Sequence, residues 1–366
     1  MKTSSRIGNR PHHGGLAWEH VDRSIRDLGH SVPADVNDVP FPPSPAVLSA
    51  LMEALAFIQW APETWGDGLQ AAIARAHDLA VESVAIDAGS SPLIDRALRL
   101  AVRGPGEVIL LAPTYSEYEA AVHRQGADTV NLGLRPEFGF VASTEQIASR
   151  LSDKTRAIVL CNPNNPTGTA LDHAALVSLL ELVPRRVSII VDEVYADFAG
   201  DVSVVDQVCR FPNLCVVRSF SKGYALAGLR VGFAVLGDEF LQNWYDEGEI
   251  PWRIGLLADV AAKAALESKD YYERQIGSLL AERDKLQSRV EREVGCSTWP
   301  SRTHFFMLQP PGDGSVDSWL RRLADPAVLI KTVRWEGQSN SRPFFRVTTR
   351  SPAENERILK ALHGWR

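Results

Sequence analysis

The chain has 366 residues, 45% of them hydrophobic, and a formal net charge of -6 at pH 7. Chains longer than roughly 250–300 residues usually divide into domains, so we expect two lobes. No basic block is present that would follow a phosphate backbone, which argues against a nucleic-acid partner. No apolar run approaches the ~20 residues that span a bilayer, so we expect no membrane partner and a cytoplasmic protein. The four cysteines follow no zinc-ligand spacing, and no metal is expected.

An irregular arm and a helix are predicted at the N-terminus. The first forty residues are rich in Gly, Pro, His and Asp, which is typical of an arm without regular structure. A helix is predicted next, because Ser44 is a good N-cap and Pro45 suits the first helical position. Its apolar residues recur at helical spacing and are Val47, Leu48, Leu51, Met52, Leu55 and Ile58. We expect this amphipathic helix to face a core.

Short apolar runs alternate with longer helical segments through the middle of the chain. The runs that predict buried strands are 84–86, 108–111, 157–160, 187–191, 215–217 and 231–235. Near-continuous apolar runs separated by helices indicate a mostly parallel sheet with helices on both faces. In such sheets ligands bind beyond the carboxyl ends of the strands.

A smaller lobe is predicted towards the C-terminus. Helical character rises beyond the last of these strands, and apolar runs at 304–308 and 344–347 predict strands of an α+β unit. The predicted fold is α/β, with an N-terminal arm over 1–40, a large domain over 41–255 and a small domain over 256–366.

One lysine has unusual neighbours. Lys222 lies in a stretch of small and hydroxyl residues between two apolar runs that predict strands. Most lysines are solvated, but burial would make this amine a better nucleophile, as Schiff-base chemistry requires. The neighbouring motifs therefore decide whether Lys222 is a catalyst.

Polar residues follow three of the predicted strands. Ser90 and Ser91 precede a helix with Pro92 at its expected first position, so their amides would form an anion cup, although plain capping uses the same pattern. Asn165 lies in a turn with two prolines, which can aim its amide at a ligand. Asp192 ends a fully apolar strand, and a buried carboxylate there needs a cationic partner.

Together these motifs resemble those of the fold-type I pyridoxal-phosphate enzymes in the class I/II aminotransferase family. The resemblance rests on Asn-Pro-Thr-Gly at 165–168, Asp-Glu-Val-Tyr at 192–195, and Ser-Phe-Ser-Lys at 219–222 followed by Arg230. It implies pyridoxal 5′-phosphate as cofactor, bonded to Lys222, with Asp192 on the ring nitrogen and Tyr195 on the ring hydroxyl. The implied cofactor-binding residues are Ser90, Ser91, Tyr115, Asn165, Asp192, Tyr195, Ser219, Ser221, Lys222, Arg230 and Trp65.

The same resemblance implies a substrate site and a homodimer with active sites at the subunit interface. Arg346 lies where the family keeps an arginine that binds the α-carboxylate of an amino acid. Within the family, the chain resembles histidinol-phosphate aminotransferases and, more closely, threonine-phosphate decarboxylases. This likeness implies that His13, Asn37 and Lys331 also bind the substrate.

Three positions depart from the pattern of these relatives. The phosphate turn begins with Asp87 where relatives have glycine, Trp65 replaces a tyrosine that reaches the partner's cofactor, and Lys331 replaces an arginine. A lysine at that position loses the bidentate fork of a guanidinium. The departures therefore concern the phosphate turn and the substrate site.

We predict an enzyme that acts on an α-amino acid with a polar or anionic side chain, by transamination or α-decarboxylation. One alternative is a specialised-metabolism enzyme that performs β- or γ-elimination, replacement or cyclisation. Another is a cofactor-binding regulator without catalysis, for which the arm is too short to supply a DNA-binding domain.

Overall fold

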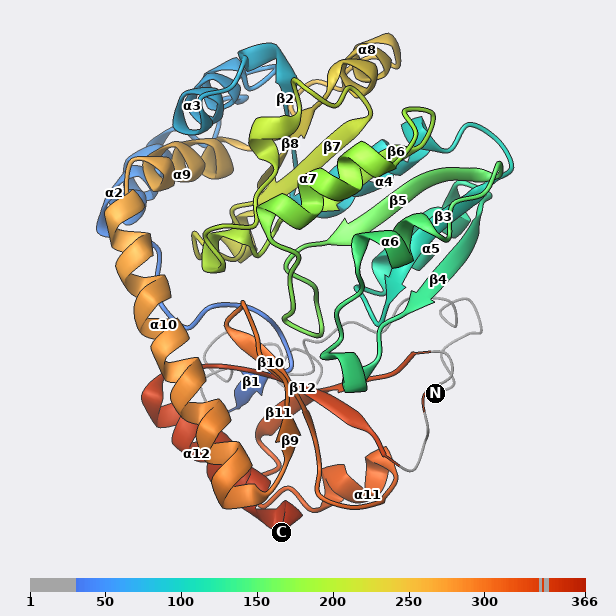
Figure 1. The fold of residues 1–366 in the computed structure, drawn as a ribbon. Coiled ribbons are helices and arrows are strands. Elements are labelled where there is room, and N and C mark those ends of the chain that lie inside the picture. The colour runs from blue at the N-terminus through green and yellow to red at the C-terminus, as the bar shows by residue number, and fades with distance from the viewer. Residues whose placement is uncertain (1–30, 336–337, 339–341) are drawn as a thin grey trace, which may run out of the picture.

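Two lobes, each built on its own sheet, make up the fold (Figure 1). The computed structural model describes residues 31–335, 338 and 342–366. The larger lobe contains a seven-stranded sheet in the order β2-β8-β7-β6-β5-β3-β4. Its strands are β2 (Val84–Asp87), β3 (Glu107–Ala112), β4 (Asp128–Gly133), β5 (Thr155–Cys161), β6 (Ser188–Asp192), β7 (Leu214–Ser219) and β8 (Gly232–Leu236). This sheet confirms the predicted α/β class and all six predicted strands.

The strands of this sheet run in one direction except β8, which is antiparallel to both of its neighbours. The carboxyl ends of β2, β3, β5, β6 and β7 therefore lie at one edge of the sheet. The sequence analysis missed β4, the edge strand. Its residues alternate between polar and apolar types, and most of them are at least partly exposed. A half-exposed strand lacks the continuous apolar run that revealed the others.

Helices cover both faces of the large sheet, with one hydrophobic core on each face. Alternate residues of a strand point to opposite cores: in β6, Ile190 lies in one core and Ile189 and Val191 lie in the other. The first core is covered by α4 (Ser90–Ala101), α5 (Glu117–Arg124) and α8 (Asp238–Asp246). The second is covered by α3 (Asp67–His77), α6 (Thr144–Ala148), α7 (His173–Leu182) and α9 (Leu256–Leu266). The domain boundary at residue 255 stays a prediction, and α9 packs with the large sheet.

The smaller lobe contains a five-stranded sheet in the order β1-β11-β12-β10-β9. Its strands are β1 (Val32–Ala34), β9 (Ser297–Thr298), β10 (Phe305–Gln309), β11 (Val328–Val333) and β12 (Phe344–Thr348). Strand β1 from the arm runs parallel to β11, and the other pairs are antiparallel. The helices of this lobe are α10 (Lys269–Arg289), α11 (Val316–Arg321) and α12 (Pro352–Leu362). The strands predicted at 304–308 and 344–347 are confirmed.

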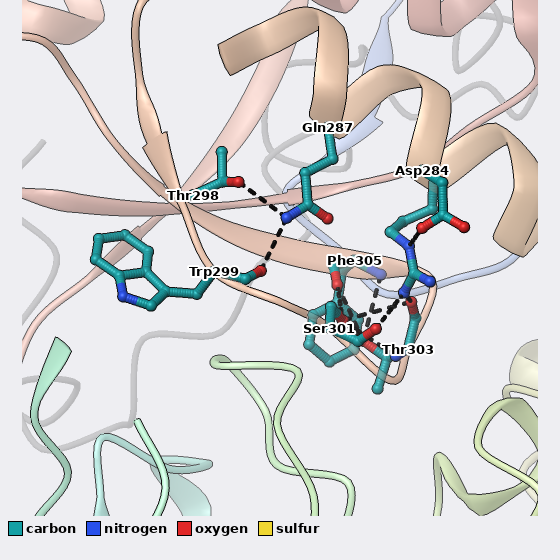
Figure 2. A network of polar contacts seen from close by, with 8 residues as sticks. Asp284, Gln287, Thr298, Trp299, Ser301, Thr303 and Phe305 are labelled. Carbon is teal, nitrogen blue, oxygen red and sulfur yellow. Dashed lines mark hydrogen bonds and ion pairs between the residues drawn. The ribbon is translucent and has the colours of Figure 1, made fainter. Parts of the chain in front are cut away.

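Helix α10 extends from the large lobe along the small one and holds the segment that leads into β10 (Figures 1 and 2). Arg283 Nη1 donates to the carbonyl of Ser301 at 2.7 Å, and Gln287 Nε2 donates to the hydroxyl of Thr298 at 2.9 Å. The Ser301 hydroxyl donates in turn to the carbonyl of Phe305 at 2.5 Å. These contacts fix the start of β10, which pairs with β12. No helix in the described part of the chain has both the length and the apolarity to cross a bilayer.

The helix predicted after the arm is α2 (Pro45–Ala54), but its apolar face is not buried as predicted. The N-cap is confirmed, since the Ser44 hydroxyl accepts from the amide of Val47 at 3.2 Å. Val47 is buried against the core, whereas the side chains of Met52 and Ile58 are 70% and 62% exposed. Helix α9 packs against α2, and Val47 and Leu51 join the core, whereas Leu48, Met52, Leu55 and Ile58 are exposed among the described residues.

Candidate functional site

A cavity of about 530 Å³ lies where the carboxyl ends of the large sheet meet residues 35–38 and the small lobe. Strand order places it there, because β2, β5, β6 and β7 all end at this edge. Twelve residues predicted from the sequence line it together: Asn37, Ser90, Ser91, Tyr115, Asn165, Asp192, Tyr195, Ser219, Ser221, Lys222, Arg230 and Arg346. The cavity therefore gathers most of the predicted site.

Three predicted residues are not placed in this cavity. Trp65 is 47% exposed and borders a separate small pocket with Ile250 and Arg253. Lys331 lies on β11 directly opposite Arg346 in the strand register, but it does not line the cavity. Burial and the charge of Arg346 lower the pKa of Lys331. His13 lies outside the described residues.

One end of the cavity is an anion cup at the start of α4. The helix begins at Ser90, two residues earlier than predicted, and Gly89 is its N-cap with φ +96°. Arg230 Nη1 donates to the Ser221 hydroxyl at 3.2 Å. A Cβ atom on Gly89 would lie 2.4 Å from Arg230 Nη2, so glycine lets the guanidinium approach the helix start. Free amides, hydroxyls and a guanidinium around one space are suited to a phosphate group.

The floor of the cavity carries a buried carboxylate. Asp192 ends β6 and is 2% exposed. The Tyr118 hydroxyl donates to its Oδ2 at 2.6 Å, and the Val194 amide donates to its Oδ1 at 3.1 Å. Burial raises the pKa of Asp192 to about 6, although both hydrogen bonds act to lower it. No cation pairs with Asp192 among the described residues, so a protonated ring nitrogen would find a counter-ion there.

Lys222 reaches the cavity from the turn after β7 and meets the arm. Its Nζ lies 2.8 Å from Oδ1 of Asp38. Burial acts to raise the pKa of Asp38, but the charge and hydrogen bond of Lys222, together with the charge of Arg350, outweigh it, and the pKa lies below its usual value. Lys222 is the only lysine among the described residues that line the cavity. The amine predicted to carry a covalent bond is thus positioned, in this structure, by an ion pair.

A chain of hydrogen bonds holds Tyr195 and the arm together. Asn37 Nδ2 donates to the Tyr195 hydroxyl at 2.8 Å, and the Thr348 hydroxyl donates to Asn37 Oδ1 at 2.8 Å. His304 Nε2 lies 3.1 Å from the carbonyl of Asn37. Burial lowers the pKa of His304 to about 3, so the neutral ring must carry its hydrogen on Nε2 to donate to that carbonyl. Tyr195 accepts from Asn37 and keeps its own hydrogen for another acceptor.

Arg346 is a buried guanidinium without a carboxylate partner among the described residues. It is 6% exposed, and Nη1 donates to Asn165 Oδ1 at 2.7 Å. Nη2 donates to the carbonyl of Asp35, while Nε has no hydrogen-bond partner. Burial lowers the pKa of Arg346, because the charged form is desolvated. A buried cation in this state is stabilised by an anionic ligand such as a carboxylate.

Seven lining residues were not predicted from the sequence, and four of them have ionisable side chains, namely Asp35, Asp38, Tyr118 and Cys161. Tyr118 follows Tyr115 by three residues; it lies in the first turn of α5, Tyr115 lies just before that helix, and the two rings meet edge to face with centroids 5.4 Å apart. That spacing was a usable signal. Asp38 follows Asn37 directly, but nothing in the sequence indicated that its carboxylate would meet Lys222, 184 residues away.

The side chains present fit pyridoxal 5′-phosphate. The anion cup suits the phosphate, the buried carboxylate of Asp192 suits the ring nitrogen, and the amine of Lys222 suits the aldehyde. Gly232 supports this fit, since a Cβ there would lie 2.9 Å from the backbone carbon of Gly89 and would displace the cup.

Comparison with known proteins gives one family. The family model described as Aminotransferase class I and II matches residues 32–362. An aromatic amino acid aminotransferase of Streptomyces avermitilis is 31% identical over 334 residues, which is 90% of this chain and 89% of the relative. A protein of the same name from Corynebacterium efficiens is 32% identical over 339 residues, covering 92% of this chain and 94% of the relative.

Solved structures share the fold. Histidinol-phosphate aminotransferase from Sinorhizobium meliloti, in complex with pyridoxal-5′-phosphate, superposes with a TM-score of 0.83 at 22% identity, covering 99% of this chain and 97% of that one. L-threonine-O-3-phosphate decarboxylase from Porphyromonas gingivalis gives 0.75 at 23% identity, covering 89% and 98%.

Proposed function

Because the chain belongs to the aminotransferase class I and II family and is an enzyme that uses pyridoxal 5′-phosphate, we propose that it transfers the amino group of an α-amino acid to a 2-oxo acid. The observation that carries this proposal is one cavity that holds an amine at Lys222, a carboxylate at Asp192 and a guanidinium without a carboxylate partner at Arg346. The first two groups serve the cofactor, and the third serves an amino acid.

Each residue has a task that its position supports. The bound cofactor supplies an electron sink that stabilises negative charge at the substrate α-carbon. Arg346 binds the α-carboxylate and thereby fixes which bond of that carbon is broken. Lys222 moves the proton at the α-carbon, since it is the one lysine among the described residues that line the cavity. Asp192 keeps the ring nitrogen charged, and Tyr195 donates to an oxygen of the ring.

We propose an aromatic side chain for the substrate. The support is that relatives at least 30% identical over about 90% of the chain are named aromatic amino acid aminotransferases. The polar or anionic side chain predicted from the sequence is the second candidate. Polar groups of the cavity at Asn37 and Asn165 support a polar side chain, whereas Lys331, opposite Arg346 on the next strand, does not line the cavity.

A product panel tests the reaction and the side chain together. The enzyme loaded with cofactor is incubated with phenylalanine, tyrosine, glutamate, histidinol phosphate and threonine phosphate, with and without 2-oxoglutarate, and the products are identified by mass spectrometry. Transamination requires the acceptor. Release of carbon dioxide without an acceptor would show α-decarboxylation in place of the proposed transamination. Release of a side-chain fragment would indicate elimination. A cytoplasmic location stays a prediction, as does the absence of nucleic-acid binding, which labelled DNA would test.

Arg346→Ala is expected to raise KM for the amino acid by about 10- to 100-fold and to leave cofactor content unchanged. The reason is that a charge-assisted hydrogen bond to a buried ion contributes roughly 1.5–3 kcal/mol. Steady-state kinetics and the absorbance of bound cofactor measure the two quantities. Arg346→Lys keeps the charge but loses the paired hydrogen bonds of a guanidinium, so its KM should lie between those of wild type and Arg346→Ala. An equal loss of cofactor and of activity would contradict the carboxylate role.

We further propose a homodimer, for which the exposed apolar face of α2 and the following residues provide support. Met52, Phe57, Ile58 and Trp60 are each more than half exposed. Apolar surface gathered in this way marks an interface more often than a solvated face. Trp65 follows on the same stretch of chain, and in a homodimer it would be able to approach the partner's cavity.

Met52→Glu is expected to shift the protein from two chains towards one, because a charge replaces an apolar side chain that the partner would cover. Light scattering after size-exclusion chromatography measures the mass across a concentration series. Leu182→Glu is the matched control, since Leu182 is a half-exposed apolar residue of α7. An unaltered mass in the Met52 variant, or a wild type of one chain, contradicts this interface.

A further inference from the structure

The amine of Lys222 is held by a residue that the cofactor chemistry leaves without a role. The partner is Asp38 of the arm, with Nζ and Oδ1 2.8 Å apart. Lys222 is mostly buried, and the carboxylate of Asp38 is half-exposed at the wall of the cavity. An ion pair between two exposed side chains contributes little to stability. In this pair the amine is mostly buried, so the contact is less screened by solvent.

The backbone that carries Asp38 is fixed from both lobes. Arg350 Nη1 of the small lobe donates to the carbonyl of Asp38 at 2.7 Å. The preceding residue, Asn37, donates to Tyr195 of the large lobe and accepts from Thr348 of the small lobe. The backbone that carries the carboxylate is therefore held by both lobes, and the carboxylate itself is bonded to Lys222.

The charged groups around Asp38 leave Lys222 as its main partner. Arg350 acts on it through the carbonyl and at longer range, His304 is neutral, and the guanidinium of Arg346 is directed towards Asn165. When Lys222 is bonded to the cofactor, the Asp38 carboxylate no longer has an ammonium as its ion-pair partner. When the amine is released and protonated, the carboxylate can pair with it again.

The chemistry of an amine gives this contact a consequence. An ammonium has no lone pair, so Lys222 must lose a proton and leave Asp38 before its nitrogen can attack an aldehyde carbon. Solvent takes that proton, the nitrogen–carbon bond then forms, and the carbonyl oxygen leaves as water with the two hydrogens that remained on the nitrogen. A carboxylate that holds the ammonium slows this entry, but it also keeps a released Lys222 in one place.

We propose that Asp38 is a positioning residue that receives the Lys222 ammonium whenever this amine is not bonded to the cofactor. The contact restrains Lys222 during cofactor uptake and orients it during turnover. Loss of the carboxylate should therefore have opposite effects on these two steps, whereas a residue that only stabilises the fold would impair both. The part that concerns turnover rests on the proposed transamination.

The first test uses the full-length protein without cofactor. Lys222 is trace-labelled by formaldehyde with cyanoborohydride, and its peptide is quantified by mass spectrometry. In Asp38→Asn we expect Lys222 to be labelled about threefold to tenfold faster than in wild type, the range for loss of one hydrogen bond to a carboxylate that is half-exposed to solvent. Asp38→Glu should restore slow labelling in part. Asp35→Asn is the matched control, because Asp35 lines the same cavity from the arm without contacting Lys222.

The second test follows the cofactor. Uptake of pyridoxal 5′-phosphate, measured by stopped-flow absorbance, should be faster in Asp38→Asn, while turnover at saturating substrate should be slower by about tenfold. Unchanged labelling of Lys222 in a folded Asp38→Asn protein overturns the proposal, as does slowing of labelling and uptake together. A KM change for one substrate with unchanged labelling would make Asp38 a substrate contact instead. The labelling test uses no amino-acid substrate, so its result is valid even if the proposed transamination is not observed.

Discussion

Lys222→Ala is expected to abolish the covalent link to the cofactor and to lower transamination by about 10²- to 10⁴-fold, the range of a lost general acid–base group. The physical reason is that the cavity contains one amine among its described residues. The variant should still bind the cofactor without a covalent bond, because the cup at Ser90, Ser91 and Arg230 is intact. This variant thereby separates non-covalent binding of the cofactor from its covalent link to the protein.

Borohydride reduction followed by peptide mass spectrometry measures the link directly, and absorbance measures the cofactor that remains bound. Lys263→Ala is the matched control, because Lys263 is a partly buried lysine paired with Asp259 in α9, away from the cavity. A covalent adduct that persists in Lys222→Ala, or one found on another peptide of wild type, would refute the assignment of Lys222.

The parts of the fold that the sequence predicted are those with a local signal. Continuous apolar runs revealed six strands of the large sheet, since strands buried on both faces need apolar residues at every position. The same criterion cannot detect β4 at the edge, where Thr129 and Asn131 are tolerated. The apolar period of α2 was read correctly as a helix, but periodicity does not distinguish a face that meets a core from one that Met52 and Ile58 leave exposed.

The candidate site shows the same division. Residues at strand ends, such as Asp192 and Lys222, were found because topology brings strand ends together. Asp38 was missed because its contact depends on how the arm crosses between the lobes. Lys331 was expected in the substrate site, but its register opposite Arg346 does not bring it to the cavity wall. The position of a residue along a strand can be predicted from the nearby sequence. The direction of a side chain at the boundary between the lobes depends on residues far away in the sequence and cannot.

Tyr118 offers the sharpest test of the buried carboxylate. Its hydroxyl donates to Asp192 Oδ2 at 2.6 Å, and this hydrogen bond opposes the effect of burial, which raises the pKa of Asp192 to about 6. The other titratable groups that face Asp192 are Cys161, Tyr115 and Tyr195. Burial raises the pKa of each of them, so they stay protonated near neutral pH. Asp192 is therefore the group in its surroundings that titrates near pH 6.

Tyr118→Phe is expected to move the acid limb of the pH profile of cofactor binding to the cofactor-free protein to higher pH by about one to two pH units. Removing a hydrogen bond to a charged group costs roughly 1.5–3 kcal/mol, and one pH unit corresponds to about 1.4 kcal/mol. The sign follows because the lost donor stabilised the ionised carboxylate, so the pKa of Asp192 rises and more of it is protonated at a given pH. Only the ionised form can hold a protonated ring nitrogen.

Profiles of cofactor affinity, measured from pH 5 to 9 on the cofactor-free protein, test this expectation. Asp192→Asn is the limiting case. We expect its cofactor affinity to fall by about 10²- to 10³-fold, as for loss of a preorganised electrostatic group, and its pH profile to lack the acid limb. Tyr272→Phe is the matched control, because it removes a buried tyrosine hydroxyl that contacts Ser44 and not the cavity. An acid limb that stays in place in Tyr118→Phe would assign the limb to another group. Movement to higher pH in Tyr118→Phe alone ties the charge of Asp192, and with it the electron sink of the cofactor, to a tyrosine that the site motifs do not contain.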